Sequence, residues 1–239
     1  MEANDKPNTY MVIVAHPDDA EFTVAGTVRK WVEEGSQVIY VVCTDGSRGS
    51  NDPQMPPVRM KPVRHAEQRE AARILGVQEV VFLDYEDGTL QPTLELRRDL
   101  TRVIRRYKPD IVICQDPTLY FYGNNYINHP DHRAAGEAAL YAIFPSAGTR
   151  FIFPELLKEG LEPHQVREVY LYGSSDPNFW IDITGTIDVK IAALKAHRSQ
   201  VAPDYAEWRL RAWNGEVGKR HGVPYAEEFK RMILFSDTE

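Results

Sequence analysis

Short apolar runs alternate with longer amphipathic stretches along the first 145 residues of the chain. The runs are continuous and rich in β-branched residues, as in strands buried on both faces, and they cover residues 10–15, 37–43, 79–83 and 111–115. The stretches between them predict helices that end near Gly35 or cover 65–76, 93–107 and 129–144. This alternation predicts an α/β, Rossmann-like three-layer fold with a mostly parallel sheet and helices on both faces.

The alternation of apolar runs and amphipathic stretches becomes less regular after Pro145. Residues 168–172 and 179–183 are predicted strands, residues 187–197 are a predicted helix, and roughly the last thirty residues are expected to be helical. No linker separates this part from the rest, so residues 1–239 are expected to form one domain whose C-terminal third packs back on the sheet. Two long predicted loops, 45–63 and 116–128, are candidates for function because long loops in compact domains often carry it.

Composition narrows the classes of partner. The formal net charge of −7 disfavours a general binder of nucleic acids or anionic membranes. The two cysteines, Cys43 and Cys114, end apolar runs and are predicted to be buried thiols in a reducing compartment. The polar start MEANDKPNTY lacks the apolar core of a signal peptide, and no apolar run reaches the ~18 residues that span a membrane. These features predict a soluble, cytoplasmic protein with neither a nucleic-acid nor a membrane partner.

Two dense polar clusters follow predicted strands. HPDD, residues 16–19, comes directly after the first strand, and HPDH, residues 129–132, comes after the loop that follows the fourth. Ligands of open parallel sheets bind beyond the carboxyl ends of the strands, and the first and fourth strands are neighbours in the commonest doubly wound order. We therefore expect the two clusters to face each other across one crevice.

The residue types of these clusters suit a catalytic metal. Imidazole and carboxylate groups are good zinc ligands, and three protein ligands with a fourth position open to water are typical of a catalytic zinc. Such a metal lowers the pKa of its bound water toward ~7 and polarises a carbonyl group. One carboxylate and one histidine are left over for acid–base work. Spacing alone only weakly favours Asp19 over Asp18 as the ligand.

Other interpretations use the same residues. An Asp before a helix is most often an N-cap, and proline is common at the first helical position. Paired aspartates after a first strand also mark Mg²⁺-binding receiver domains, but these are about half as long and do not require HPDH. Neither GxxxxGK[ST] nor GxGxxG follows the first strand, so no nucleotide site is expected.

With both clusters in view, the chain resembles the LmbE-like (PIG-L) family of zinc-dependent deacetylases, whose signature is AHPDD after the first strand and HPDH later. Both motifs are present unbroken at residues 15–19 and 129–132. Weaker matches are Gly26-Thr27, Thr44-Asp45-Gly46 with Gly49, Arg64-His65-Ala66-Glu67, Leu75-Gly76, Phe82-Leu83, Asp87-Gly88, and Lys190 with His197-Arg198-Ser199-Gln200. The resemblance covers roughly residues 10–200.

The resemblance implies a role for each matching residue. It makes His16, Asp19 and His132 the ligands of one Zn²⁺, although Fe²⁺ or Co²⁺ could use the same set. It makes Asp18 the general base and His129 the group that stabilises the oxyanion or protonates the leaving amine, with Asp131 tuning His129. Arg64 resembles a contact to a substrate hydroxyl. Family members typically remove acetyl groups from N-acetylglucosamine units, so we expect a small-molecule amino-sugar substrate, and the resemblance also suggests a homo-oligomer.

Further expectations concern the loop before HPDH. Tyr126 is a candidate for assisting the reaction, and Asn128 is a candidate for contacting substrate or for capping the next helix. The aromatic loop 120–126 could stack on a sugar ring or lie at a subunit contact. Two other functions remain open: deacylation of a different N-acyl amine, such as a thiol-sugar precursor, and metal-dependent binding without catalysis. The intact Asp18 and His129 argue against the second, because a binding protein needs no spare base and acid.

Overall fold

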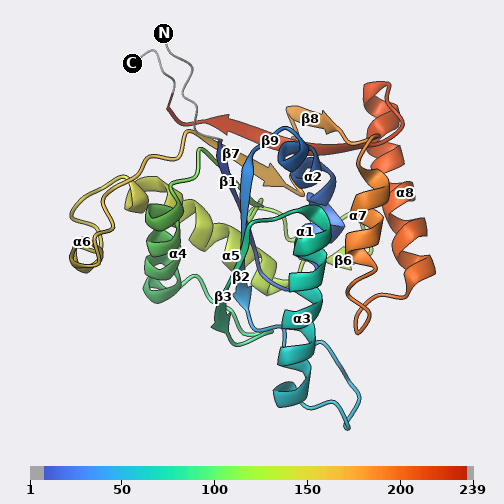
Figure 1. The fold of residues 1–239 in the computed structure, drawn as a ribbon, viewed down its shortest axis with the longest axis horizontal. Coiled ribbons are helices and arrows are strands. Elements are labelled where there is room, and N and C mark those ends of the chain that lie inside the picture. The colour runs from blue at the N-terminus through green and yellow to red at the C-terminus, as the bar shows by residue number, and fades with distance from the viewer. Residues whose placement is uncertain (1–7, 236–239) are drawn as a thin grey trace.

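A computed structural model describes residues 8–235 and has a seven-stranded sheet at its centre (Figure 1). The order of the strands is β3-β2-β1-β4-β7-β9-β8. The strands are β1 (Thr9–Val14), β2 (Gln37–Thr44), β3 (Glu79–Tyr85), β4 (Ile111–Gln115), β7 (Glu168–Tyr172), β8 (Phe179–Asp182) and β9 (Ala226–Ile233). The helices are α1 (Asp19–Thr23), α2 (Ala25–Glu33), α3 (Pro57–Leu75), α4 (Leu94–Tyr107), α5 (Pro130–Tyr141), α6 (Glu155–Lys158), α7 (Ile187–Leu194) and α8 (Pro203–His221), and the π-helical segment η1 covers Ala142–Ala147.

The predicted mostly parallel sheet is confirmed. The strand β1 pairs in parallel with β2 on one side and with β4 on the other, and β4 pairs in parallel with β7. The direction of winding therefore reverses between β1 and β4, and the carboxyl ends of the strands at such a switch point are where open α/β sheets bind their ligands. β2 and β4 are buried almost throughout, which explains why their sequences are continuous apolar runs.

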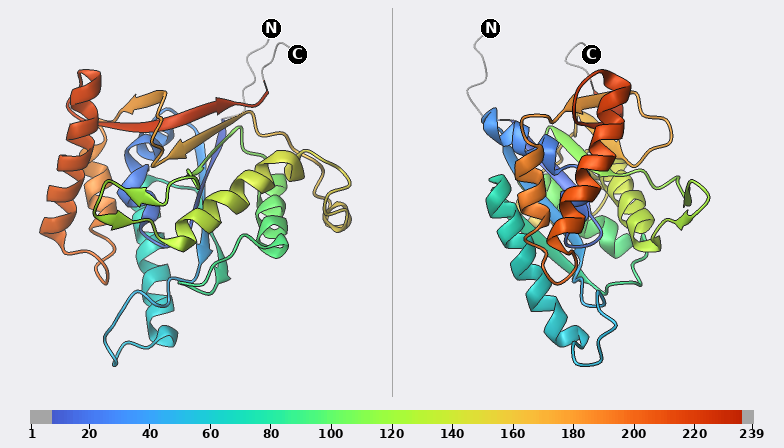
Figure 2. Two further views of the ribbon diagram at one scale, coloured as in Figure 1. Left: turned by 180° about the vertical axis from the view of Figure 1, so that it is seen from behind. Right: turned by 90° about the vertical axis from the view of Figure 1, so that its right-hand side faces the viewer.

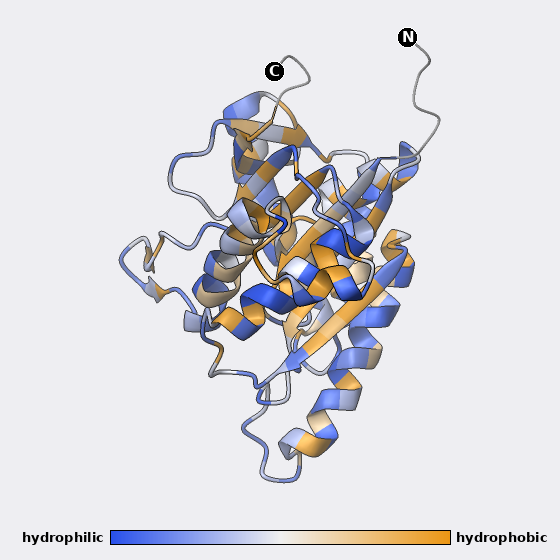
Figure 3. Ribbon diagram, turned by 90° about the vertical axis from the view of Figure 1, so that its left-hand side faces the viewer, coloured by the Kyte–Doolittle hydropathy of each residue, from blue (hydrophilic) through white to orange (hydrophobic). Residues whose placement is uncertain are grey.

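Helices cover both faces of the sheet, as predicted (Figure 2). One apolar cluster joins the sheet to α4, α5 and η1, and a second joins its other face to α1, α2, α3 and α7. A third cluster packs α8 against α7 on the outside of the second layer. The central strands β1, β2 and β4 are strongly apolar, whereas the helices mix apolar and polar residues (Figure 3).

The C-terminal third extends the sheet, and one prediction about it was wrong. Only the helix α8 is helical in the last part of the described chain; β9 follows it and runs antiparallel between β7 and β8. The sequence of β9, AEEFKRMI, mixes four charged residues with apolar ones, so it lacks the apolar run that identifies the central strands. Its antiparallel pairing leaves part of it open to water, which permits those charges.

Two long loops also differ from expectation. α3 begins at Pro57, well inside the predicted loop 45–63, because proline suits the first helical position and Pro62 removes only one backbone donor near the start of the helix. The loop 116–128 contains a small hairpin of β5 (Phe121–Tyr122) and β6 (Tyr126–Ile127), which projects from the body of the molecule in Figure 2. No helix of residues 8–235 is long and apolar enough to cross a membrane. Most of the segment MEANDKPNTY, residues 1–7, lies outside the described residues.

Candidate metal and catalytic site

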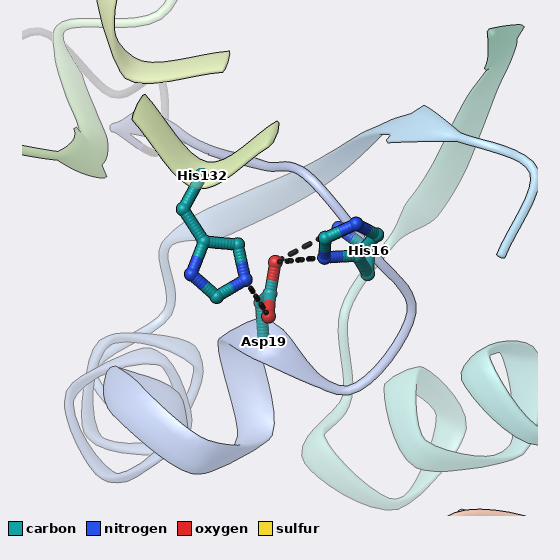
Figure 4. Close-up of side chains that lie close together, drawn as sticks. All are labelled: His16, Asp19 and His132. Carbon is teal, nitrogen blue, oxygen red and sulfur yellow. Dashed lines mark hydrogen bonds and ion pairs between the residues drawn. The ribbon is translucent and has the colours of Figure 1, made fainter. Parts of the chain in front are cut away.

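The two clusters meet beyond the carboxyl ends of β1 and β4, as the sequence predicts. His16 follows β1, Asp19 begins α1, and His132 lies in the first turn of α5. The Asp19 carboxylate lies between the two rings: Oδ1 is 3.0 Å from His132 Nε2 and Oδ2 is 3.5 Å from His16 Nδ1 (Figure 4). One ligand atom from each of these residues lies within 4.8 Å of the other two. His16, His129 and Asp131 form an overlapping second group of the same kind.

The turn of HPDD has an unusual backbone. Asp18 has a φ of 97°, in the left-handed region that only a few residue types such as Asp tolerate. Its side chain makes no capping hydrogen bond to α1, so the capping interpretation is wrong for this motif. Instead the Asp19 carboxylate accepts a hydrogen bond of 2.8 Å from the His16 amide, which closes the turn from within.

HPDH does cap its helix. Pro130 is at the first helical position of α5, and His129 is the N-cap residue, whose Nδ1 accepts a hydrogen bond of 3.1 Å from the Asp131 amide. Because Nδ1 accepts, the proton of a neutral His129 ring is on Nε2. Capping and candidate chemistry therefore use the same side chain.

His16 is held by carboxylates on both ring nitrogens. Nε2 lies 3.1 Å from Asp131 Oδ2 and 3.2 Å from Asp87 Oδ1, while Nδ1 faces Asp19. Burial lowers the pKa of His16, but the hydrogen bonds to Asp131, Asp19 and Asp87 outweigh it and raise the pKa well above its usual value. A histidine whose second nitrogen donates to a carboxylate has a fixed ring orientation, which is typical of a metal ligand.

Asp131 supports His16 rather than the His129 ring. Its carboxylate accepts hydrogen bonds from the amides of Gly88 at 2.7 Å and Leu90 at 3.1 Å, besides its contact with His16. Its hydrogen bond with His129 runs through the backbone amide instead. Sequence reasoning did not single out Asp87 as a site residue; the only signal was the Asp87-Gly88 turn after β3.

The pKa values of the two aspartates of HPDD are shifted in opposite directions. Burial raises the pKa of Asp18 to about 6, although Arg64 opposes the shift from 3.1 Å away. Burial also raises the pKa of Asp19, but His132 and His16 outweigh it, so the net shift is well below the usual range. Asp19 thus stays ionised, as a ligand should, and the pKa of Asp18 lies near the range of a general base.

His129 completes the centre. Its ring lies 4.7 Å from the His16 ring and 5.3 Å from the His132 ring, measured between centroids. Burial and these two neighbouring histidines lower the pKa of His129, so the neutral ring is favoured near pH 7.

The three candidate substrate contacts have different surroundings. Arg64 is buried, and its guanidinium donates to Pro17 O, to Gly46 O at 3.2 Å and to Asp18. Asn128 is also buried, and its amide donates to Leu119 O and accepts from Gln115. Tyr126 is exposed on β6 of the hairpin. Of the three, only Tyr126 has a side chain free to meet a solute without rearrangement.

The donor set suits a divalent metal. Two imidazole nitrogens and one carboxylate oxygen come from the ends of different elements, and the second nitrogen of His16 is already engaged by carboxylates. Beside these candidate ligands lies a further, half-buried carboxylate, Asp18, that belongs to neither candidate group. Fold and site together therefore define an α/β protein with a candidate metal centre at the switch point of its sheet, with the donor types of a metal-dependent hydrolase.

Comparison with known proteins identifies the family. The GlcNAc-PI de-N-acetylase (PIG-L) family model matches residues 11–143, and the chain belongs to this family. Enzymes of this family are metal-dependent N-deacetylases, so the predicted class of enzyme, an N-deacetylase, is confirmed.

Individual relatives support the same class. The diacetylchitobiose deacetylase of Thermococcus kodakarensis is 36% identical over 220 residues, which are 91% of this chain and 80% of that protein. The 1D-myo-inositol 2-acetamido-2-deoxy-α-D-glucopyranoside deacetylase of Rhodococcus erythropolis is 30% identical over 84% of each chain. The solved N,N'-diacetylchitobiose deacetylase of Pyrococcus horikoshii, in complex with its inhibitor, superposes with a TM-score of 0.87 at 33% identity, over 97% of this chain and 88% of that one.

Proposed function

We propose that this protein is a zinc-dependent hydrolase that removes the acetyl group from an N-acetylglucosamine unit of a short saccharide or small conjugate. The observation that carries the proposal is the Asp19 carboxylate between His16 and His132, with the unliganded base Asp18 beside it. The two diacetylchitobiose deacetylases among the relatives support a short N-acetylated sugar as the substrate.

In this proposal His16, Asp19 and His132 hold the metal. A bound zinc ion supplies an acidified water and polarises the amide carbonyl. The Asp18 carboxylate accepts the proton of the attacking water, and its pKa of about 6 leaves it mostly ionised at pH 7. That proton is then available to the nitrogen of the leaving amine.

His129 is proposed to stabilise the oxyanion. Its Nδ1 is occupied by the Asp131 amide, so the neutral ring presents an Nε2 proton as a hydrogen-bond donor. The lowered pKa of His129 suits this role, because the neutral tautomer already donates and needs no extra proton. One such donor contributes about 3 kcal/mol to transition-state stabilisation. Asp131 is proposed to position His16 and the first turn of α5 that carries His129.

The remaining proposals concern substrate and assembly. Tyr126 is proposed to contact the sugar, and Arg64 and Asn128 are proposed to shape the pocket by holding the turns around it. We propose a homo-oligomer in the cytoplasm. Exposed Phe121 and Ile127 on the hairpin support a subunit contact, and the buried free thiols Cys43 and Cys114 support a reducing compartment.

The test is release of free amine from N-acetylglucosamine, diacetylchitobiose and glucosaminides with varied aglycones, by zinc-loaded and by chelated protein. Zinc-dependent release from at least one sugar is expected. Asp18→Asn should bind one zinc per chain and lose turnover by at least about a hundredfold, because the carboxamide cannot accept the proton. Full turnover by Asp18→Asn would show that the base is misassigned. Absence of release from every sugar by zinc-loaded protein would refute the proposed substrate class.

A further inference from the structure

A chain of buried polar groups lies behind Asp18. The Asp18 amide donates a hydrogen bond of 3.0 Å to Gln68 Oε1, and Gln68 Nε2 donates one of 3.0 Å to Glu21 Oε1. The other oxygen of that carboxylate, Glu21 Oε2, lies 3.1 Å from His197 Nε2. Gln68, Glu21 and His197 are all fully buried. They come from α3, α1 and the segment after α7, so three separate parts of the polypeptide converge behind the turn that carries Asp18.

The donor and acceptor groups allow only one orientation of the Gln68 carboxamide in this series of hydrogen bonds. A backbone amide can only donate, so the oxygen of Gln68 must face Asp18 and its NH₂ group must face the Glu21 carboxylate. Burying a carboxylate and an imidazole without water costs free energy unless both are well paired, and such networks select one geometry. His197 Nδ1 has no partner among the described residues, so the one hydrogen bond of the imidazole ring within residues 8–235 is the bond to Glu21.

The turn held by these hydrogen bonds has an unfavourable backbone conformation at Asp18. Asp18 is in the left-handed region, which is unfavourable for a non-glycine residue, so the surrounding structure must enforce it. The amide of Asp18 is held from one side by Gln68, and its carboxylate is held from the other by Arg64. Together the two contacts set the direction in which the carboxylate points.

We infer that Gln68, Glu21 and His197 are positioning residues for the reaction: they lock the Asp18 peptide so that the carboxylate faces the attacking water. The inference rests on the proposed function, in which Asp18 is the base. It also gives a role to His197, whose motif with Arg198, Ser199 and Gln200 the metal site leaves unexplained.

A neighbouring contact provides the control. Glu67, the residue before Gln68 on α3, accepts hydrogen bonds from the Ser199 amide at 2.8 Å and from Ser199 Oγ at 2.6 Å. It therefore ties α3 to the same segment as the buried chain does, but none of its hydrogen bonds reaches Asp18. Glu67→Ala removes two hydrogen bonds between α3 and the segment after α7, and none of them involves Asp18.

The main experiment compares Gln68→Met with Glu67→Ala, using zinc-loaded protein and diacetylchitobiose or the best sugar of the panel. Methionine keeps the length of the side chain and removes the acceptor. We expect kcat to fall about tenfold to a hundredfold in Gln68→Met, with KM and zinc stoichiometry unchanged, because a small misplacement of a catalytic group has an effect of this size. Glu67→Ala should keep the wild-type kcat.

A conservative exchange tests the geometry directly. Gln68→Glu alone places two carboxylates face to face and should lower kcat by a similar factor. The double variant Gln68→Glu/Glu21→Gln restores each donor and acceptor. Its new carboxylate on α3 accepts from the Asp18 amide, and its new carboxamide on α1 donates to that carboxylate and accepts from His197. We expect its kcat to return to within about fivefold of wild type, a rescue that the single changes do not predict if they act independently.

Amide hydrogen exchange of Asp18 in the metal-free protein needs neither substrate nor zinc. The amide should be protected in wild type and in Glu67→Ala, and should exchange at least about tenfold faster in Gln68→Met. An unchanged kcat with a protected Asp18 amide in Gln68→Met would overturn the inference, as would failure of the double variant to regain activity. If Asp18→Asn keeps full turnover, the proposed base is wrong whatever the exchange measurement shows, so the two failures are distinguishable. If Gln68→Met does not fold, the two Gln68→Glu variants decide.

Discussion

At the scale of single residues, Asp131 holds the ring of His16, one of the proposed metal ligands. It accepts from the amides of Gly88 and Leu90 and contacts His16 Nε2, so all of its direct side-chain contacts fix its own position or that of His16. The ring of His16 is thereby oriented with Nδ1 toward Asp19. In the proposed centre, Asp131 would thus act on the metal through the orientation of a ligand.

Asp131→Asn should therefore weaken zinc binding. The carboxamide offers one acceptor where the site has three donors, and its NH₂ group would face a donor. We expect the dissociation constant for zinc to rise about tenfold to a hundredfold, measured by competition with a chromophoric chelator. Asp84→Asn is the control, because Asp84 is half exposed and contacts His65 and Lys61 instead. Equal zinc affinity in Asp131→Asn and wild type would contradict this role.

The pair of His197 and Glu21 predicts a pH dependence of stability. Burial lowers the pKa of His197, but Glu21, Asp18 and Glu67 outweigh it and the net shift is upward. A folded-state pKa above the unfolded value means that the pair stabilises the fold fully below about pH 6.5, and that this contribution is lost as pH rises through the folded pKa.

The measurement is urea unfolding of metal-free wild type and His197→Gln between pH 5.5 and 8.5. The difference in the free energy of unfolding should be largest at the acid end and should shrink as pH rises. A difference that grows with pH would show that His197 is buried as the neutral ring.

Sequence reasoning predicted the residues of the centre better than the residues around it. HPDD and HPDH are local motifs that each follow a recognisable strand, so their meeting beyond the carboxyl ends of β1 and β4 could be predicted and is confirmed. His197 was a weaker match in the family resemblance, but its contact with Glu21, and through Glu21 with Gln68, could not be predicted, because His197 is 176 positions from Glu21 and the packing of α7 against α1 and α3 brings them together. The roles in catalysis and metal binding stay predictions.

At the scale of elements, apolar runs identify strands that are buried on both faces. β1, β2 and β4 were predictable because burial excludes polar residues from both of their sides. β9 was not, because its antiparallel position tolerates four charged residues. The first turns of α3 lie within the predicted loop because prolines favour loops in a sequence, although proline also fits the start of a helix.

The helix α5 places His129 and His132, and its own position depends on a glycine. A Cβ at Gly136 would lie 2.3 Å from the backbone oxygen of Gln115 in β4, a distance that no side-chain movement relieves. Alanines 134, 135, 138 and 139 share the buried side of the helix, so α5 lies unusually close to the sheet. The small residues of this helix thus set the depth at which HPDH enters the site.

Gly136→Ala should push α5 away from β4. We expect a loss of about 1–3 kcal/mol in the free energy of unfolding, typical of overpacking, together with weaker zinc binding. Gly185→Ala is the matched control, since no atom lies within 4 Å of its added Cβ and its φ is not positive, so stability should be unchanged. Urea unfolding and chelator competition on both variants test this prediction. Equal free energies of unfolding for the two variants would show that α5 and β4 can move apart without loss of stability.

At the scale of the whole molecule, the fold assembles a centre from distant parts of the sequence. His16 and Asp131 are 115 positions apart, and Asp87 comes from a third strand end. Each strand contributes its following residues to the same edge, because β3, β2, β1 and β4 are parallel. A metal held by His16, Asp19 and His132 would therefore connect the β1–α1 and β4–α5 units, and its binding should affect the stability of the whole fold.

Zinc should stabilise the protein, and the effect should depend on the ligand set. A ligand that binds only the folded state adds about 2.7 kcal/mol at a hundred times its dissociation constant, which for a chain of this size is a rise in Tm of about 5–10 °C. The measurement is thermal unfolding of chelator-treated protein against increasing zinc. His132→Ala removes one ligand that is not needed for the sheet, so its Tm should respond to zinc by less than about 2 °C. An equal response of wild type and His132→Ala would mean that zinc binds elsewhere and that the centre beyond the carboxyl ends of β1 and β4 is not its site.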